Sequence, residues 1–392
     1  MTAQRVAVTA IGVVSPLGVG VAENLAGLRA GRDAVTAASA FDVSLCRAKT
    51  AGQVDAGWTF AGADRRWHRA SHFTAAAMRE VHAGDPGFAP ELAVIGTTSG
   101  GMSFGEKYQR AQIAQQRPRQ RAQWLANYMP QKAVLDALGA CEWMAPMQII
   151  ANACASGSNA IGHAFQLVRA GLHRSVVCGG YDAISELVFV GFDSLQAATP
   201  EKVRPFDRNR TGLVLGEGAA MLALESLESA RRRGAAILGE VTGYGIATDN
   251  HHLTQPHPSG VGPRMAMERA LADARREAGG IDYINAHGTA TPFNDATEGL
   301  AIAQLFGSRV AVSSTKSMMG HALGAAGAIE AVFSLLAIRE GFIPPNINYA
   351  EADPAFALDI VANEARDARP RRVLSNSFGF GGTNASIVLE AA

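Results

Sequence analysis

One cysteine stands where its side chain could act as a nucleophile. Cys154 lies in the stretch I-I-A-N-A-C-A-S-G-S-N-A-I-G (149–162), where an apolar run changes period and continues as a helix. Free backbone N–H groups and the helix dipole stabilise a thiolate at such a position by about 0.3–2 kcal/mol, so we expect a lowered pKa for this thiol. The alternative, and the commoner use of a single cysteine, is a small buried side chain that allows close helix packing.

Two of the ten histidines have surroundings that leave room for a ligand. His287 lies in N-A-H-G-T-A-T-P, directly after the apolar run 283–286, and His321 lies in K-S-M-M-G-H-A-L-G-A-A-G at a predicted helix start. Each histidine alone is more often structural than catalytic. Together with an activated cysteine they form the minimum set for acyl transfer through a thioester, and this joint interpretation is favoured.

Other sites are less well supported by the sequence. The glycine-rich segment N-S-F-G-F-G-G-T-N (376–384) lacks the G-x-x-x-x-G-K-[ST] pattern of a phosphate-binding loop, so a nucleotide function has little support. His251, His252 and His257 share one loop, but few acidic or cysteine ligands lie near them in the sequence, and we predict no metal site there. The four cysteines show neither CxxC pairing nor zinc spacing, which is typical of reduced thiols.

The elements that would position these residues alternate between strands and helices. Apolar runs predict strands at 5–14, 92–96, 175–178, 213–215, 219–224, 237–244, 283–286 and 310–313, and helices at 21–29, 68–82, 263–277 and 323–339. This alternation predicts an α/β fold. Segments 147–169 and 310–339 share one layout, a strand, a reactive turn and an apolar helix, which predicts two related halves. A composition change at 231–233 divides them into residues 1–236, with the cysteine, and residues 237–392, with both histidines.

Composition narrows the class of protein further. Charged residues make up 18% of the 392 residues, below the roughly 25% of typical soluble domains, which favours a subunit interface and an oligomer. The net charge is zero, so nothing indicates binding to nucleic acid or to an anionic membrane. The first 14 residues are typical of a strand and not of a signal peptide, and no apolar run reaches a membrane span. We therefore expect a cytoplasmic protein.

Four motifs carry a resemblance that covers essentially the whole chain. N-A-C-A-S-G at Cys154, H-G-T-A-T-P-x-N-D at His287, K-S-M-M-G-H-x-x-G-A-A-G-x-x-E from Lys316 to Glu330, and N-S-F-G-F-G-G-T-N from Asn376 closely resemble the β-ketoacyl-acyl-carrier-protein synthases of the elongating Cys-His-His type. The resemblance implies a thiolase-like fold, with two similar halves in a five-layer α-β-α-β-α arrangement. It also implies a homodimer, or a heterodimer with a related subunit.

The resemblance further implies a decarboxylating Claisen condensation. Cys154 would take an acyl group from a carrier-protein thioester, and malonyl carrier protein would then lose CO2 to give the attacking enolate. His287 and His321 would donate N–H groups to the malonyl thioester oxygen, where each such donor is typically worth about 10²–10³ in rate. The backbone N–H groups of Cys154 and Phe380 would form the oxyanion hole.

Supporting roles follow from the same resemblance. Lys316 and Glu330 would organise His321, and their apolar surroundings independently predict a buried pair, because an unpaired charge there would be costly. The substrate would be contacted by Thr289 and Thr291, which would bind the phosphopantetheine arm, by Phe378 and Phe380 at the acyl pocket, and by His252 and Thr254 in a second active-site loop (249–254). No cofactor is implied beyond the phosphopantetheine arm of the acyl carrier protein. Apart from the resemblance, Arg65, Arg66 and Arg69 lie on a stretch predicted to be helical and are candidate contacts for an acidic carrier protein, although exposed arginines more often have no such role.

Named residues separate this interpretation from its rivals. A non-catalytic partner subunit that sets chain length would typically lack the cysteine, which this chain keeps together with both histidines. A thiolase would carry a second cysteine in the last glycine-rich loop, and a chain-initiating synthase would have Asn in place of His321. The accepted chain length, and the choice between fatty-acid, polyene and polyketide pathways, stay open because segment 103–130 cannot be aligned with relatives.

Overall fold

Ten strands of a mixed twelve-stranded sheet form two sets with one shared topology. The computed structural model describes residues 3–392. The first set is β1 (Val6–Ser15), β5 (Leu92–Gly96), β6 (Met147–Ile150), β7 (Ser175–Asp182) and β8 (Gly218–Ser226). The second set is β9 (Gly239–Thr248), β10 (Tyr283–Asn285), β11 (Ala311–Ser313), β15 (Arg372–Gly379) and β16 (Thr383–Glu390).

Both sets have the same strand order and the same strand directions. The spatial order of the strands is β6-β5-β7-β8-β1 in the first set and β11-β10-β15-β16-β9 in the second. If the strands of each set are numbered one to five along the chain, both orders read 3-2-4-5-1. In each set the first two pairings are parallel and the last two are antiparallel. The sets join where β1 pairs with β9 over three residues. The shared layout of 147–169 and 310–339 is thereby confirmed as the third strand of each set and its following helix, while the boundary at residue 236 stays a prediction.

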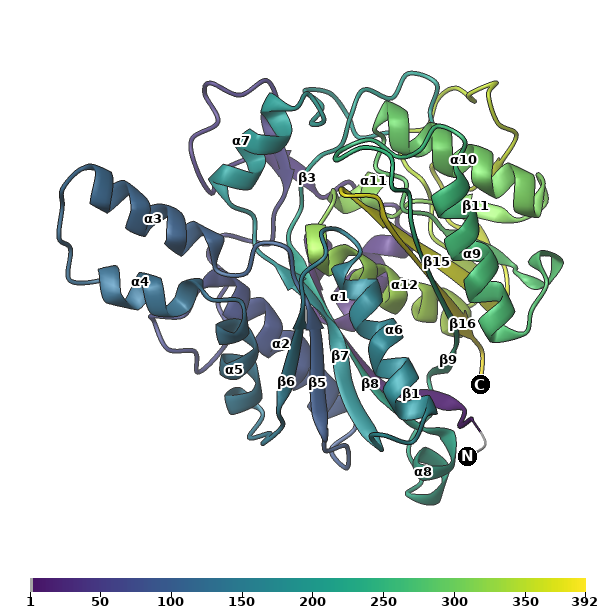
Figure 1. Ribbon diagram of the computed structural model, residues 1–392, viewed down its shortest axis with the longest axis horizontal. Helices are drawn as coiled ribbons and strands as arrows, with labels where there is room; N and C mark the ends of the chain where they lie inside the picture. The colour runs from purple at the N-terminus through teal and green to yellow at the C-terminus, as the bar shows by residue number, and fades with distance from the viewer. Residues whose placement is uncertain (1–2) are drawn as a thin grey trace.

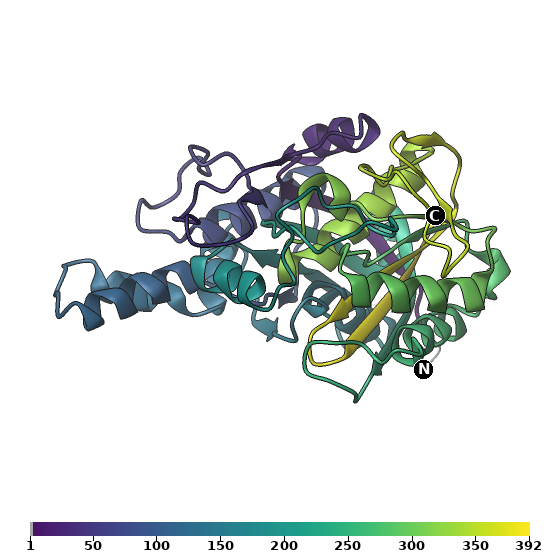
Figure 2. The same ribbon diagram turned by 90° about the horizontal axis from the view of Figure 1, so that it is seen from above.

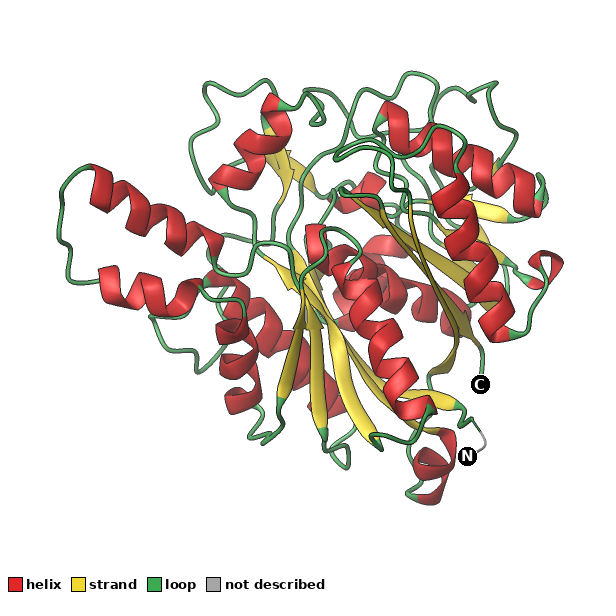
Figure 3. Cartoon of the chain, viewed as in Figure 1, coloured by secondary structure: helices red, strands yellow, loops and turns green. Residues whose placement is uncertain are grey.

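Helices complete a five-layer arrangement, as the resemblance implies (Figures 1 and 3). Helices α2 (Arg69–Gly84) and α5 (Gln131–Ala140) cover the outer face of the first set, and α9 (Val261–Ala274) and α10 (Pro292–Phe306) cover the second. Between the sets lie α6 (Ser156–Arg169) and α12 (Ala326–Glu340), whose side chains share one core with strands of both sets. Residues 326–337 of α12 are all buried and, apart from Glu330 and Ser334, are glycine or apolar, as expected of a helix segment that faces protein on every side.

The remaining helices and strands lie outside the layers described above or connect them. A hairpin of α3 (Met102–Ile113) and α4 (Arg121–Tyr128) projects from the body in both ribbon views (Figures 1 and 2). The other helices are α1 (Val21–Arg29), α7 (Glu186–Ser194), α8 (Leu227–Arg232) and α11 (Lys316–Met319), with 3₁₀ turns at Ala278–Gly280 and Leu323–Ala325. The short strands are β2 (Gly18–Val19), β3 (Val35–Ala37), β4 (Thr50–Gly52), β12 (Phe342–Ile343), β13 (Asp359–Ile360) and β14 (Arg366–Asp367).

Some predicted elements differ from the structure. Segment 213–215 is not a strand of the sheet: it forms isolated bridges, one of them between Leu215 and His321, because it connects α7 to β8 alongside the His321 turn. The predicted helix 323–339 begins with a separate 3₁₀ turn and becomes α-helical at Ala326. Helix α9 begins at Val261 and ends at Ala274, since Arg275 adopts a left-handed φ of 55°. No helix of the described residues 3–392 has the length and apolarity needed to cross a membrane.

Candidate active site

Cys154 lies in the turn between β6 and α6, two residues before the first residue of α6. The residue before it, Ala153, has a φ of 57°, which is costly for a residue with a Cβ and is typically retained at sites where geometry matters. Gly379, at the end of β15, approaches this turn so closely that a Cβ there would lie 3.1 Å from the Cys154 backbone nitrogen. The Cys154 turn therefore combines an unfavourable backbone conformation at Ala153 with close packing against Gly379.

The predicted lowering of the Cys154 thiol pKa is wrong. Burial raises that pKa to about 12, and the positive charge of Lys316 opposes the rise only in part. A buried thiolate loses hydration that the helix start does not replace. The resting nucleophile is therefore a protonated thiol, which must lose its proton as it attacks.

The two histidine rings lie side by side at the end of the second set of strands. The His287 and His321 ring centroids are 5.2 Å apart with an interplanar angle of 85°. Burial, followed by the charge of Lys316, holds the pKa of both imidazoles well below the usual value, so both are neutral. Both ring nitrogens of His321 and Nδ1 of His287 are buried and have no hydrogen-bond partner among the described residues. A neutral imidazole has one N–H donor, which is here left for a ligand.

Close helix packing brings Cys154 and His321 together. A Cβ on Gly157, in the first turn of α6, would lie 2.7 Å from the Gly324 carbonyl oxygen, and a Cβ on Gly327 would lie 2.2 Å from Ser158 Oγ. Glycines at these positions let the beginnings of α6 and α12 pack more closely than larger residues would allow. This packing brings the turn before α6, which carries Cys154, near the segment before α12, which carries His321, and both side chains line one cavity.

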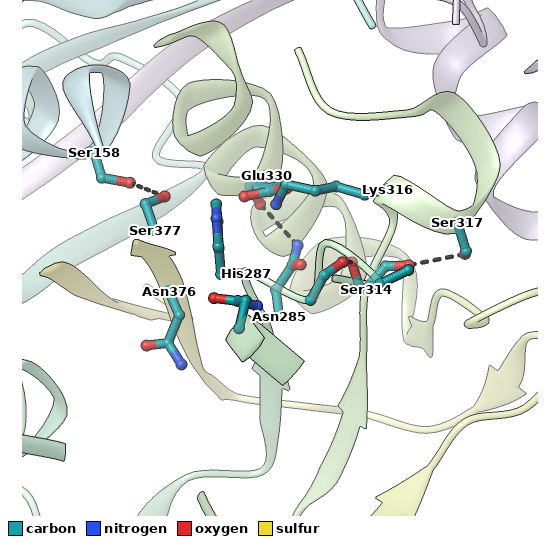
Figure 4. Close-up of polar contacts among 12 residues, drawn as sticks. Ser158, Asn285, His287, Ser314, Lys316, Ser317, Glu330, Asn376 and Ser377 are labelled. Carbon is teal, nitrogen blue, oxygen red and sulfur yellow. Dashed lines mark hydrogen bonds and ion pairs between the residues drawn. The ribbon is translucent and has the colours of Figure 1, made fainter. Parts of the chain in front are cut away.

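Lys316 and Glu330 form the predicted buried pair. Lys316 Nζ contacts Glu330 Oε1, and both side chains are almost fully buried (Figure 4). Burial raises the pKa of Glu330 to about 7 despite the lysine. Asn285 at the end of β10 donates to the Glu330 carbonyl oxygen at 3.3 Å. The pair therefore joins α11 to α12, and Asn285 ties α12 to β10, the strand that precedes His287.

A cavity of about 300 Å³ joins most of the predicted residues. Its wall includes Cys154, His287, His321, Thr289, Thr291, Thr254, Phe378 and Phe380. Neither the Cys154 nor the Phe380 backbone N–H donates a hydrogen bond to any other group of residues 3–392, which leaves both free to bind an oxyanion. Thr291 also caps α10 by accepting from the Asn294 N–H at 3.4 Å.

Two predicted contacts lie elsewhere. His252 is not part of the cavity wall; its exposed ring accepts from the Thr254 N–H at 3.1 Å and so shapes the loop. Arg69 binds the buried Glu217 at 2.7 Å, so its charge is neutralised inside the fold. Arg65 and Arg66 are exposed, but they lie in the turn before α2 and not on a helix. In residues 3–392 no group of three or more His, Cys, Asp or Glu side chains is arranged to hold a metal ion.

Two buried carboxylates that sequence reasoning missed hold the site in shape. Glu298 accepts from the His287 and Gly288 N–H groups, each at 2.8 Å, and burial raises its pKa to about 7. Asp182 accepts from the backbone N–H groups of Thr98, Ser99 and Gly324, which ties the turn after β5 to the turn after His321. An acidic residue at the end of an apolar strand, as in S-V-V-C-G-G-Y-D, is the signal that could have identified Asp182.

Comparison with known proteins agrees with this geometry. Residues 3–230 match the family described as "Beta-ketoacyl synthase, N-terminal domain", and residues 238–350 match "Beta-ketoacyl synthase, C-terminal domain". The chain belongs to the β-ketoacyl synthase family. Among similar proteins, the 3-oxoacyl-[acyl-carrier-protein] synthase 2 of Synechocystis is 38% identical over 99% of this chain and 98% of its own. The same enzyme of Coxiella burnetii is 38% identical over 100% and 99%.

Solved β-ketoacyl synthase structures share the fold over its full length. The ishigamide ketosynthase/chain length factor has a TM-score of 0.93 at 36% identity and covers 100% of both chains. The ketosynthase ApeO in complex with its chain length factor ApeC, from Xenorhabdus doucetiae, has a TM-score of 0.87 at 29% identity and covers 99% of this chain and 98% of that one. These neighbours, together with the family match, confirm the predicted thiolase-like fold.

Proposed function

We propose that this β-ketoacyl synthase condenses an acyl group held on Cys154 with malonyl-acyl carrier protein, giving β-ketoacyl-acyl carrier protein and CO2. The observation that carries the proposal is the shared cavity: one thiol and two neutral imidazoles with unpartnered nitrogens face the same space. The proposal agrees with the names of the full-length relatives, which are 3-oxoacyl-[acyl-carrier-protein] synthases.

The first step transfers the acyl group to the enzyme. Cys154 Sγ attacks the thioester carbonyl carbon, and the backbone N–H groups of Cys154 and Phe380 stabilise the resulting oxyanion. The bond to the carrier's sulfur breaks, and the thiol proton leaves with the carrier as its free thiol. Because the resting thiol is protonated, its proton must leave Sγ as the attack proceeds, and one proton is gained by the departing carrier sulfur.

The second and third steps form the carbon–carbon bond. When the malonyl thioester binds, its C–CO2⁻ bond breaks, and the electron pair becomes an enolate whose oxygen accepts hydrogen bonds from His287 and His321. The enolate carbon attacks the acyl-Cys154 carbonyl, the C–S bond breaks to release the Cys154 thiolate, and this thiolate takes up one proton from solvent water. Positive histidines would not be needed, since two neutral N–H donors in a dry site stabilise the developing charge.

The supporting residues act on these groups. Lys316, paired with Glu330, contributes to keeping both imidazoles neutral. Thr289 and Thr291 are positioned at the cavity wall to hydrogen-bond the phosphopantetheine arm. Phe378, whose ring centroid lies 5.7 Å from that of His287, lines the acyl end together with Phe380. Thr254 contacts the arm from the second loop, with His252 fixing that loop. The proposed chemistry uses these side chains and the carrier's arm, without a resident metal or cofactor.

Acyl carrier protein and a second synthase-like subunit are the proposed partners. A neighbouring solved structure is described as a type II polyketide synthase carrier protein in complex with its ketosynthase, and another as a ketosynthase in complex with its chain length factor. The exposed Arg65 offers positive charge to an acidic carrier, whereas the charge of Arg66 is paired with Asp64 at 2.5 Å. Strand β6 has a free edge, and a dimer, with a copy or a related subunit, would cover it. We propose that the enzyme works in the cytoplasm.

The alternative function is that of a non-catalytic subunit that sets chain length. Structural neighbours include such complexes, so the fold alone does not exclude it. The retained Cys154, His287 and His321 in one cavity favour the catalytic function.

Acylation and decarboxylation test the two functions separately. The enzyme is incubated with a panel of acyl carrier proteins, and its intact mass is recorded. An acyl adduct that is lost in Cys154→Ala supports the assignment of Cys154 as the nucleophile. An adduct that persists in that variant contradicts this assignment. His321→Ala should keep the adduct and lose most release of CO2 from malonyl carrier protein; unchanged release would remove His321 from the mechanism. A wild-type chain that forms no adduct with any carrier would favour the non-catalytic function.

A further inference from the structure

Helix α7 forms a wall between the active-site cavity and a second cavity. Phe192 and Leu195, at its carboxyl end, line the active-site cavity. Leu187 and Val190, nearer its beginning, line a cavity of about 540 Å³ shared with the α3–α4 hairpin. In Figures 1 and 2, α7 lies beside the base of that hairpin, outside the five layers of the core. Its position therefore depends on contacts with loops and with the hairpin.

The beginning of α7 is capped by a side chain from another helix. Its own N-cap residue, Ser185, makes no side-chain cap, and Ser185 Oγ is buried without a partner. Instead Glu106 Oε1, from α3, accepts from the Leu187 N–H at 2.8 Å. Arg110, one turn further along α3, pairs with Glu186 at 2.5 Å. A carboxylate at a helix N-terminus satisfies a free N–H group and interacts favourably with the helix dipole.

The carboxyl end of α7 supports the loop that carries Phe380. The Phe192 and Phe380 rings stack with centroids 5.3 Å apart and an interplanar angle of 21°. Gly381, the next residue, donates to the Leu253 carbonyl oxygen at 2.7 Å, so the loop is held between α7 and the second active-site loop. A shift of α7 would move one of these two supports, and with it the Phe380 backbone N–H.

We propose that Glu106 is a positioning residue for acyl transfer: by capping α7 it fixes Phe192, which holds Phe380 with its N–H directed at the oxyanion. This inference rests on the proposed function, in which the Phe380 N–H acts in the transfer step and the two histidines act in decarboxylation. It predicts that disturbing Glu106 impairs the first step and spares the second. A general loss of folded protein would reduce both.

The test compares three variants of the full-length enzyme in both half-reactions. Glu106→Ala removes the cap, Glu106→Gln keeps an oxygen that can accept from the Leu187 N–H, and Gln112→Ala, exposed on the same helix, is the matched control. Acylation of Cys154 by an acyl carrier protein is timed by intact mass, and CO2 release from malonyl carrier protein is measured in the same preparations. Size-exclusion chromatography compares their oligomeric state.

Glu106→Ala should slow acylation by about 10-fold, part of the 10²–10³ that complete loss of an oxyanion donor costs, and leave CO2 release within about twofold. Glu106→Gln should recover most of the acylation rate, and Gln112→Ala should match wild type. An unchanged acylation rate in Glu106→Ala, or an equal fall in both half-reactions, would overturn the inference. If wild type itself is not acylated, the proposed function fails and this inference falls with it; if wild type is acylated, only the inference is at stake.

Discussion

Replacing Glu298 by glutamine should change how the stability of the enzyme depends on pH. Burial raises the pKa of this carboxyl from 4.5 to about 7, a difference that corresponds to about 3 kcal/mol. In the unfolded chain the carboxyl ionises near its ordinary pKa, whereas in the folded chain it keeps its proton until about pH 7. Between these two values the folded state binds more protons, so the free energy of unfolding falls as pH rises.

Glutamine removes this pH dependence and adds a constant cost. The two oxygens of Glu298 each accept one backbone N–H, from His287 and from Gly288. A glutamine has one oxygen, so one N–H would face an amide NH2 group, at a cost of about 1–3 kcal/mol that does not vary with pH. The difference in free energy of unfolding between wild type and Glu298→Gln should therefore depend on pH. Wild type minus variant should be about 3 kcal/mol larger at pH 4.5 than at pH 8.

Urea unfolding at several pH values between 4.5 and 8 measures the effect. Glu142→Gln, at an exposed position whose side chain makes no hydrogen bond among the described residues, is the control and should follow the wild-type profile. The sloping part of the Glu298→Gln profile should be flatter than that of wild type, although Glu330, whose pKa is raised in the same direction, keeps some of the slope. A difference between wild type and Glu298→Gln that stays constant from pH 4.5 to 8 would refute the reasoning.

Three further predictions concern the groups around Cys154. Alkylation of Cys154 by iodoacetamide should rise with pH through pH 9 without a plateau, because burial raises the thiol pKa to about 12; a plateau near pH 7 would restore the lowered pKa expected from the helix start. Gly379→Ala should slow acylation by about 10²–10³, the effect of losing an oxyanion donor, because the new Cβ would lie 3.1 Å from the Cys154 nitrogen. The control is Gly139→Ala, whose new Cβ would have no atom within 4 Å and which should leave the acylation rate unchanged. Lys316→Met should lower the free energy of unfolding, measured in urea, by about 3–5 kcal/mol because it leaves Glu330 unpaired. The double variant Lys316→Met with Glu330→Leu should recover most of this lost stability without restoring condensation. Equal stability of the single and double variants would show that the two charges do not depend on each other.

Local patterns sufficed to predict much of this structure. The strand, turn and helix around Cys154, and the repeat of that layout around His321, follow from apolar periodicity and from the placement of small residues. Because both segments occupy the third strand of identical strand sets, their shared layout also indicated the two-part topology. The pairing of Lys316 with Glu330 was predictable since neither charge could be buried alone.

The rest depended on contacts between distant segments. The Cys154 thiol pKa was predicted in the wrong direction because a helix start is a local feature, whereas burial is set by the packing of α6 against α12. Arg69 could not be recognised as part of the fold without its partner Glu217, and Asp182 and Glu298 act on backbone groups that no side-chain pattern reveals. The Glu106 cap likewise joins two helices that the sequence does not connect.

In the proposed function, Cys154, His287 and His321 together carry out a decarboxylating condensation. Its most direct test is to supply wild type, Cys154→Ala and His287→Ala with one acyl carrier protein and with malonyl carrier protein, and to record the intact mass of the carrier product. Wild type should convert the malonyl carrier into a β-ketoacyl carrier extended by the acyl group, with loss of CO2, and neither variant should form that product. A β-ketoacyl product formed by Cys154→Ala at the wild-type rate, or its absence with wild type across acyl chain lengths, would contradict the account.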